Sequence, residues 1–172
     1  EELILLAVGR TPNSDKAGIP SLGLKIEKEK IETNGFMETS VKNVYAIGDL
    51  TGKYAYAHTA YEHARIAAQK ILSPHSNETM DDTKIPNVIF TTPEIAWVGL
   101  TEAEAKEIFK NVKVQKNNFA ANSKARIFGD IQRWSKTVYD GDTVTVLDVQ
   151  LIGPGYTDLI REACVLVTQK TS

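Results

Sequence analysis

A carboxylate at the end of a short apolar run is the side chain best placed to do chemistry. Residues 44–47 form the run, and Gly48 and Asp49 follow it directly. Open α/β sheets bind ligands beyond the carboxyl ends of their strands, and a glycine there lets a ligand approach the backbone closely. Asp49 could then accept hydrogen bonds from a polyol or a ribose. The alternative is that Asp49 only starts a turn, which is the better interpretation of an isolated Gly-Asp pair.

The helix that follows favours the ligand-binding interpretation of Asp49. Small and apolar residues recur at helical spacing over residues 57–72, so this helix begins near Ala57 and His58. The first turn of a helix has backbone N–H groups without partners in the helix, and it carries the positive end of the helix dipole. Such a terminus attracts electron-rich groups at the tip of a neighbouring strand.

The remaining reactive side chains predict no catalytic or metal site. Cys164 is the only cysteine, and its place in an apolar helical pattern indicates a structural role. His58 and His63 are five residues apart, which points them in different directions around a helix, so no metal pair is predicted. His75 lies in a linker.

Two strands and one helix are expected to position Asp49. Residues 3–8, which end at Gly9, and residues 44–47 are unbroken apolar runs, typical of strands covered on both faces of a parallel sheet. Alternating charges over residues 25–32 indicate a solvent-facing hairpin. Thr59 and Glu62 have the spacing of a capping box. The predicted inner face of the helix consists of Ala57, Ala60, Tyr61, Ala64, Ala67, Ala68 and Ile71.

The pattern changes after residues 74–84, whose composition is typical of a linker, and we place a domain boundary near Asp82. Beyond it, strands followed by a helix on one face describe an antiparallel α+β layer. Gly153-Pro154-Gly155 is interpreted as a tight turn into the last helix. The predicted strands are residues 88–90, 95–98, 112–119, 134–139 and 144–152, with a hairpin turn at 140–142, and the predicted helices are 101–109, with a Thr101–Glu104 capping box, and 156–167.

Composition limits the classes of partner. The 172 residues are 42% hydrophobic and 24% charged, enough to bury a core without disulfides or a metal. A net charge of -2 argues against a nucleic acid as the main partner. The apolar runs are far shorter than the roughly 20 residues that span a membrane. One cysteine is compatible with a reducing compartment, so we expect a cytoplasmic protein. Because the chain opens without Met and ends without a helix stop signal, we also expect a fragment of a longer protein.

Several segments, in this order along the chain, resemble the FAD-dependent pyridine nucleotide-disulfide oxidoreductases. Residues 7–13, Ala-Val-Gly-Arg-Thr-Pro-Asn, are similar to the segment in which the nicotinamide domain of that family returns to the FAD domain. Residues 44–49 and the helix start at 57–58 resemble its second flavin-binding motif. Within the family, the resemblance is greatest to dihydrolipoamide dehydrogenases, followed by mercuric and glutathione reductases. Residues 86–102, 119–125 and 151–155 are similar to the interface domain of the pyridine nucleotide-disulfide oxidoreductases.

The resemblance implies a mixed fold, α/β and α+β. Residues 1–81 would be the end of the nicotinamide domain and the second half of the FAD-binding domain, part of a three-layer FAD/NAD(P)-binding domain. Residues 82–172 would be the antiparallel-sheet interface (dimerisation) domain, truncated at its C-terminus. This domain would form a homodimer, with Ile89, Trp97, Val165 and Val167 among the apolar positions in the contact.

The resemblance also implies FAD and NAD as cofactors. Asp49 would hold a ribityl hydroxyl of FAD beside Gly48, and Gly9 would border the NAD nucleotide. The helix start would stabilise negative charge that develops on the flavin. Relatives often have Met-Leu where this chain has Ala55-Tyr56. The residues expected along the flavin are Ala55, Tyr56, Ala57 and His58.

The implied activity belongs to the parent protein. It passes electrons from a dithiol through a protein disulfide and FAD to a nicotinamide, with a dithiol/disulfide substrate and a 2-oxo acid dehydrogenase complex as implied partners. The redox cysteine pair and the His-Glu dyad of the family lie outside this chain, so no catalytic residue is assigned and the fragment alone is expected to be inactive. The alternatives are a non-catalytic dimerisation module, or a relative of mercuric or glutathione reductase.

Overall fold

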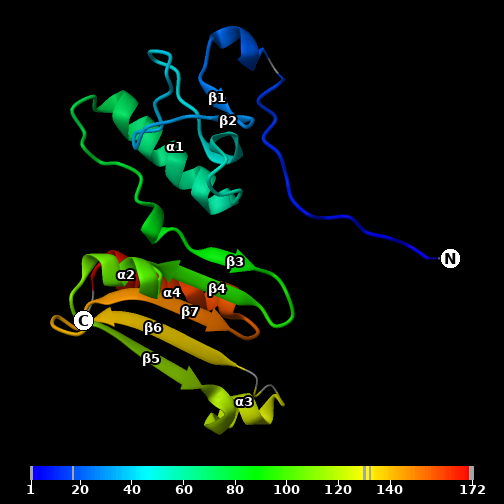
Figure 1. The fold of residues 1–172 in the computed structure, drawn as a ribbon, viewed down its shortest axis with the longest axis vertical. Helices are drawn as coiled ribbons and strands as arrows, with labels where there is room; N and C mark the ends of the chain where they lie inside the picture. Colours follow the sequence, from blue (N-terminus) through cyan, green and yellow to red (C-terminus); the bar gives the residue numbers. More distant parts are fainter. Residues whose placement is uncertain (1, 17, 130, 132, 171–172) are drawn as a thin grey trace. The chain divides into compact units, whose positions relative to one another are not determined.

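The computed structural model of the chain describes residues 2–16, 18–129, 131 and 133–170. It divides into two compact units, Glu1–Asp81 (unit 1) and Asp82–Ser172 (unit 2). Figure 1 shows the long helix of unit 1 and the antiparallel sheet of unit 2. In the part of the chain that is described, no helix has both the length and the apolar character needed to cross a membrane.

Unit 1 contains one long helix and several short elements, among them the predicted hairpin, which is confirmed. Its two strands pair antiparallel. The turn residues Lys28 and Glu29 have φ values of 49° and 65°, as a two-residue hairpin turn requires. An ion pair between Lys25 Nζ and Glu32 Oε2, 2.6 Å apart, joins the two sides of the hairpin at the end away from its turn. The elements of unit 1 are η1 (Ile19–Leu22), β1 (Ile26–Glu27), β2 (Lys30–Ile31), η2 (Gly48–Thr51) and α1 (Ala57–Leu72).

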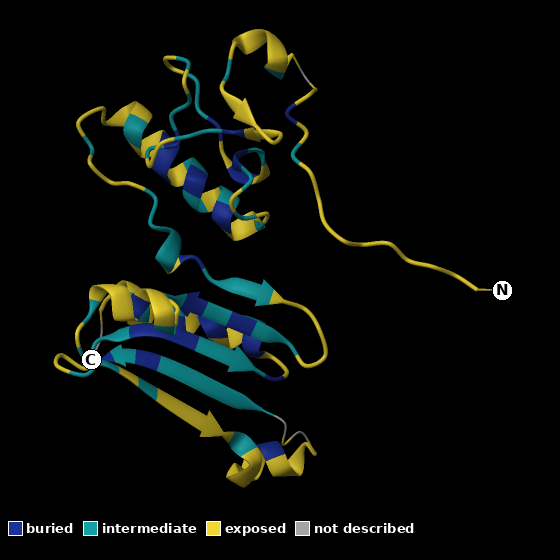
Figure 2. Ribbon diagram, viewed as in Figure 1, coloured by how far each residue is buried: buried dark blue, intermediate teal, exposed yellow. Residues whose placement is uncertain are grey.

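The two parallel strands predicted for unit 1 are wrong. Residues 3–8 form no strand, and their large apolar side chains are 80–96% exposed (Figure 2). Residues 44–47 contribute only an isolated bridge between Glu38 and Tyr45, and Ile47 is 40% exposed. A strand is stable only beside a hydrogen-bonded neighbour, and the described residues supply no further neighbour for either run. An apolar run indicates that a segment could form a strand, but it does not show whether a neighbouring strand is present to pair with it.

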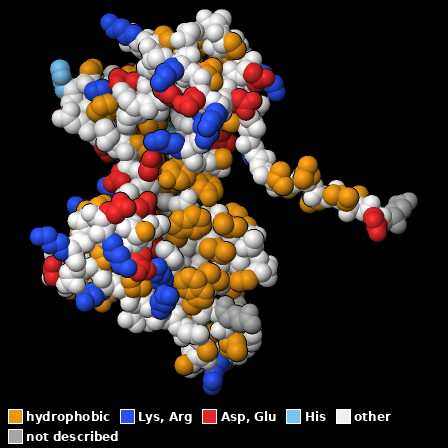
Figure 3. Space-filling model, in the orientation of Figure 1, with side chains coloured by type: hydrophobic (Ala, Val, Ile, Leu, Met, Phe, Trp, Pro, Cys, Tyr) orange, Lys and Arg blue, Asp and Glu red, His pale blue; other side chains and the backbone are white. Residues whose placement is uncertain are grey.

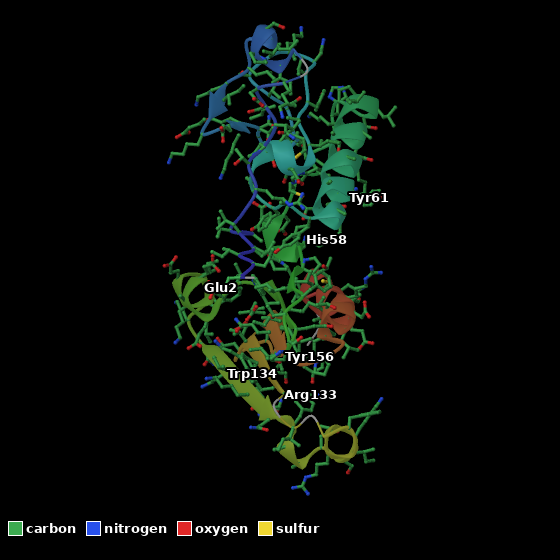
Figure 4. All side chains as sticks on the ribbon, turned by 90° about the vertical axis from the view of Figure 1, so that its right-hand side faces the viewer. Glu2, His58, Tyr61, Arg133, Trp134 and Tyr156 are labelled. Atoms are coloured by element: carbon green, nitrogen blue, oxygen red, sulfur yellow. The ribbon has the colours of Figure 1, made fainter. Side chains whose placement is uncertain are left out.

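Helix α1 has the predicted bounds, but of its predicted inner face only part is turned to the core. Tyr61 and Ile71, expected inside, are 79% and 57% exposed, and Figure 4 labels Tyr61 along this helix. Ala67 is buried as predicted, and together with Ile66, which was not predicted, it packs against Met37 in a small core that selects the orientation of the helix. The buried residues of α1 are Thr59, His63, Ile66 and Ala67.

Unit 2 is the predicted antiparallel layer, and its five strands and two longer helices are confirmed. The sheet has the order β3-β4-β7-β6-β5, with every neighbouring pair antiparallel. The capping box of Thr101 and Glu104 is present. Helix α3 was not predicted, because five residues are too few to show a helical period. The elements of unit 2 are η3 (Asp82–Lys84), β3 (Asn87–Ile89), β4 (Ile95–Gly99), α2 (Glu102–Ile108), β5 (Val112–Asn118), η4 (Phe119–Ala121), α3 (Ser123–Ile127), β6 (Trp134–Asp140), β7 (Val146–Ile152) and α4 (Tyr156–Thr168).

Helix α4 covers one face of the sheet. Cys164 is half-buried and packs against the core between helix and sheet, so its predicted structural role is confirmed. Val167 is half-buried and packs against the same core, and its place in a dimer contact stays a prediction. Its position follows from helical spacing, which puts it one turn beyond Ala163. The buried members of this core are Ala96, Val98, Val149, Ile160 and Ala163.

The turn before α4 is the predicted tight turn. Gly155, with a φ of 75°, stands at the N-cap of the helix. The Thr157 backbone N–H and hydroxyl both donate to Glu94 Oε2, at 3.1 and 2.8 Å. These hydrogen bonds hold the pKa of the Glu94 carboxyl below its usual value. The chain's own carboxylate therefore occupies the N-terminus of α4.

The face of the sheet opposite α4 carries a row of apolar residues. Ile89 pairs with Ile95, Ile95 with Ile152, and Ile152 with Trp134. Directly paired residues share a face, whereas their chain neighbours, such as Ala96, point to α4. Figure 3 shows hydrophobic side chains gathered over unit 2. We call these four residues the apolar row.

Asp148 is a fully buried acid in β7. Gln150 Nε2 donates to its Oδ2 at 2.8 Å, while Oδ1 has no hydrogen-bond partner among the described residues. Burial raises the pKa of Asp148 to about 7, although the hydrogen bond from Gln150 and the positive charge of Lys136 favour the ionised form. The Asp148 carboxyl therefore titrates near neutral pH.

We predict that Asp148→Asn stabilises the chain at pH 8. The pKa of Asp148 rises from 3.8 to about 7 on folding, so its protonated form gives stability that is complete below pH 3.8 and lost as the pH rises to 7. Burying the ionised form then costs free energy, and we expect a gain on the order of 2 kcal/mol from the amide. Urea unfolding at pH 5 and 8 measures it. Asp142→Asn, in an exposed turn, is the control, and an equal gain at both pH values would contradict the prediction.

Candidate functional site

The turn that carries Asp49 is held to helix α1 by one buried hydrogen bond. The Gly48 backbone N–H donates to His63 Nδ1 at 3.0 Å, and both residues are buried. Gly48 has a φ of 65°, and a Cβ at this position would lie 3.2 Å from Ala60 Cβ. Only glycine fits this close approach without strain. The predicted strand tip therefore lies against the beginning of α1, although the strand itself is not formed.

Further hydrogen bonds close the turn and leave the Asp49 side chain outside it. The Thr51 hydroxyl donates to the Gly48 carbonyl at 2.9 Å, and the Gly52 N–H donates to the Asp49 carbonyl at 3.0 Å. The Asp49 side chain is exposed, and no described residue gives it a hydrogen bond or an ion pair. The carboxylate is therefore free to accept hydrogen bonds from a ligand.

The N-terminus of α1 has no side-chain cap. The N-cap residue is Tyr56, and the predicted capping box of Thr59 and Glu62 is wrong because Thr59 is the third residue inside the helix. Thr59 is fully buried, and its Oγ1 has no hydrogen-bond partner among the described residues. The first backbone N–H groups of α1 therefore receive no acceptor from a capping side chain.

Two aromatic rings mark the start of α1. The rings of Tyr56 and His58 stack with centroids 5.1 Å apart and an interplanar angle of 11°. Figure 4 labels His58 at this end of the helix. Ala55, Ala57 and His58 are exposed and Tyr56 is half-buried. The residues expected along a flavin thus form a continuous accessible segment beside the helix terminus.

Gly9 is the one predicted site residue that the structure does not bring to this turn. It lies in the exposed segment that follows residues 3–8, with no atom within 4 Å of the position of a Cβ. Among the described residues, no three or more His, Cys, Asp or Glu side chains are grouped so as to hold a metal ion. The candidate site is therefore formed by η2 and the start of α1.

His63 belongs to this site although it is not among the predicted site residues. In the sequence it stands out only as a possible metal-binding partner of His58, which lies on another side of the helix. A usable signal was present, because Thr59 and His63 are four residues apart and share a helix face with the apolar Ile66. Polar residues on an apolar face require hydrogen-bond partners.

Comparison with known proteins defines the class. Residues 2–64 match the family model described as pyridine nucleotide-disulphide oxidoreductase. Residues 85–172 match the model described as the dimerisation domain of the same family. The chain belongs to the pyridine nucleotide-disulphide oxidoreductase family, as the sequence resemblance predicted. The expected mixed fold, with the end of an FAD/NAD-binding domain followed by a dimerisation domain, is also confirmed.

Dihydrolipoyl dehydrogenases are among the curated relatives. The chain is 38% identical to that of Bacillus subtilis over 164 residues, which are 94% of this chain and 34% of the relative. It is 39% identical to that of Thermus scotoductus over 161 residues, which are 93% of this chain and 34% of the relative. The chain thus spans about a third of the length of these relatives.

Solved structures share the fold. LpdA from Mycobacterium tuberculosis superposes with a TM-score of 0.86 at 22% identity, covering 96% of this chain and 36% of that chain. The HOCl-induced flavoprotein disulfide reductase RclA from Escherichia coli superposes with a TM-score of 0.80 at 24% identity, covering 94% of this chain and 37% of that chain. At these identities the likeness concerns the fold.

We predict that Gly48→Ala destabilises the chain more than Gly23→Ala. Both glycines are left-handed, with φ values of 65° and 68°, and an alanine there costs about 1–2 kcal/mol. Only the Gly48 substitution also pushes a methyl against Ala60, whereas Gly23 faces open space. Urea unfolding of the two variants measures the difference. Equal losses would show that the approach of η2 to α1 is not tight.

Proposed function

We propose that this chain is the C-terminal part of an FAD- and NAD-dependent dihydrolipoyl dehydrogenase. Unit 1 is then the end of the nicotinamide domain and the second half of the FAD-binding domain, and unit 2 is the interface domain. The dihydrolipoyl dehydrogenases among the relatives support this assignment. The redox cysteines and the acid-base dyad of the enzyme lie outside this chain.

The observation that carries the proposal is the exposed Asp49 carboxylate, held by η2 against the start of α1. The fit to a flavin rests on the groups at this place that have no partner: this carboxylate, the Thr59 hydroxyl and the uncapped helix terminus. Asp49 accepts a hydrogen bond from a ribityl hydroxyl, and Gly48 keeps the backbone close. When bound, the flavin supplies the two-electron chemistry that links a dithiol to a nicotinamide.

The segment from Ala55 to His58 lies along the flavin in this proposal. Its backbone contributes the helix N-terminus, whose positive dipole end stabilises negative charge on the ring. The stacked rings of Tyr56 and His58 give this segment an aromatic surface beside the helix terminus. In the whole enzyme, residues 3–8 would pair with neighbouring strands, and Gly9, which follows them, would then border the NAD nucleotide.

The same proposal makes the enzyme a homodimer through unit 2. The match to a dimerisation domain supports it, and so does the apolar row on the sheet face opposite α4. Ile89 in this row is 41% exposed, and burying such a row against a second copy stabilises a dimer by removing apolar area from water.

An assay of the whole enzyme tests the proposed activity. The dithiol of dihydrolipoamide loses two electrons and two protons to become the disulfide, and NAD⁺ takes up a hydride while one proton is released. We expect the purified whole protein to carry flavin absorbance and to form NADH with this dithiol faster than with glutathione. Flavin without such turnover would favour another disulfide substrate, and absence of flavin would favour the non-catalytic dimerisation module.

We predict that Asp49→Ala loosens FAD in the whole enzyme. A hydrogen bond to a charged acceptor contributes about 1.5–3 kcal/mol, so the dissociation constant should rise about tenfold to a hundredfold. Absorbance titration of the flavin-free protein measures it. Asp15→Ala, an exposed acid in the same unit, is the matched control. Equal flavin affinity of the Asp49 and Asp15 variants would remove Asp49 from the site.

A further inference from the structure

We infer that His63 is a positioning residue for the flavin-binding turn and that it acts only as a neutral imidazole. The inference rests on the proposed flavin function. The new element is a side chain, His63, that makes no contact with the flavin in the proposed function and yet controls how firmly Asp49 is held. Its consequence is that flavin retention weakens in acid.

The hydrogen bond between Gly48 N–H and His63 Nδ1 is 3.0 Å long and buried at both ends. Gly48 directly precedes Asp49 in the chain. The hydrogen bond that fixes the Gly48 amide therefore also fixes the backbone from which the Asp49 side chain extends. Removing the acceptor would leave a buried N–H without a partner, which is more costly than the bond itself is stabilising. The turn would then move to find another acceptor, and Asp49 would move with it.

His63 itself is rigidly placed. It is fully buried and shares the inner face of α1 with Ile66 and Ala67, which pack against Met37. The imidazole therefore links the turn to the core of unit 1 instead of to a mobile surface. Such support from a fixed side chain keeps a binding group in its productive geometry.

The bond also specifies the protonation state of Nδ1. A ring nitrogen that accepts a hydrogen bond carries no proton, whereas both nitrogens of an imidazolium are donors. Protonation of His63 would set one N–H against another, and the Gly48 amide would lose its acceptor. Histidine is the side chain that ordinarily gains its proton between about pH 8 and pH 5.

The surrounding elements contain few charges that could take over this role. The titratable or charged groups on elements around the bond are Asp49 in η2, Lys30 in β2, Tyr45 before η2, and His58, Tyr61, Glu62, Arg65 and Lys70 in α1. Glu62 is held by Arg65, with Nε and Nη2 hydrogen bonds of 2.9 and 2.7 Å. Asp49 is exposed, and the aliphatic part of the Lys30 side chain packs against Gly52. The variants below separate His63 from all of these groups.

The test measures the rate of FAD release from the whole holoenzyme by flavin fluorescence, from pH 8 to about pH 5. His63→Asn keeps an acceptor atom near the position of Nδ1 but cannot be protonated in this range. His63→Leu keeps the apolar volume and removes the acceptor. His75→Asn, at an exposed position after α1, is the matched control. Circular dichroism at each pH shows that the variants remain folded.

We expect release from the unmodified enzyme and the His75 variant to accelerate as the pH falls. The His63→Asn variant should release FAD near the unmodified rate at pH 8 and show little change in acid. The His63→Leu variant should release FAD about tenfold faster at every pH, as expected for a buried donor without an acceptor. A merely structural role would not be rescued by asparagine and would not produce the difference in pH dependence.

Two results would overturn the inference while leaving the proposed function intact. One is a His63→Leu variant that retains FAD as well as the unmodified enzyme, and the other is the same pH dependence in the unmodified and His63→Asn proteins. An unmodified whole protein that binds no FAD at all would overturn the proposed function, and the inference with it.

Discussion

The position of η2 in unit 1 depends on one hydrogen bond between a backbone amide and a histidine. Unit 1 has a small core and two-residue strands, so little else fixes η2 against α1. The bond from Gly48 to His63 does so in a buried place, where an unpaired donor would be costly. The left-handed φ of Gly48 and its approach to Ala60 follow from the same contact. The helix thus both supports the turn and offers its own N-terminus beside it.

Unit 2 is stabilised in a different way, by a sheet whose two faces have separate roles. The face towards α4 is a closed core in which Ala96, Val98 and Val149 are buried against Ile160. The opposite face keeps the apolar row. Beside it, α2 packs Ala105 against Val138 and Leu147 in a second core, and an ion pair joins Glu102 of α2 to Lys136 of β6. The α2 core covers part of this face, so the apolar row is the part of it that gains from being covered by another surface.

Sequence patterns predicted those elements that are stabilised by their own residues or by near neighbours. The capping box of Thr101, the hairpin around Lys28 and the bounds of α1 all belong to this group. Patterns failed where a partner decides the outcome. Residues 3–8 have the composition of a strand but no neighbour among the described residues, and the inner face of α1 was chosen by Met37, far away in sequence.

The candidate site shows the same division. Gly48 and Asp49 could be found because a glycine and an acid after an apolar run are a local signal. Helical spacing could place His63 on the apolar face of α1, but it could not name the hydrogen-bond partner, which is a backbone amide fifteen positions earlier. Family resemblance predicted the residues that would face a ligand, whereas the hydrogen bond behind them became visible only in the structure.

The order of strands in unit 2 has a consequence for how the protein is made. Strand β4 lies between β3 and β7. Val98 of β4 pairs with Val149 of β7, so this pairing can form only after β7 has been synthesised. Pairings between distant segments close late, because loop-closure entropy is lost before they form. On the ribosome, β3 and β4 therefore emerge as an incomplete hairpin, and the sheet can close only after β7 has left the exit tunnel. During that interval Ile89 and Ile95 are accessible to chaperones and to other nascent chains.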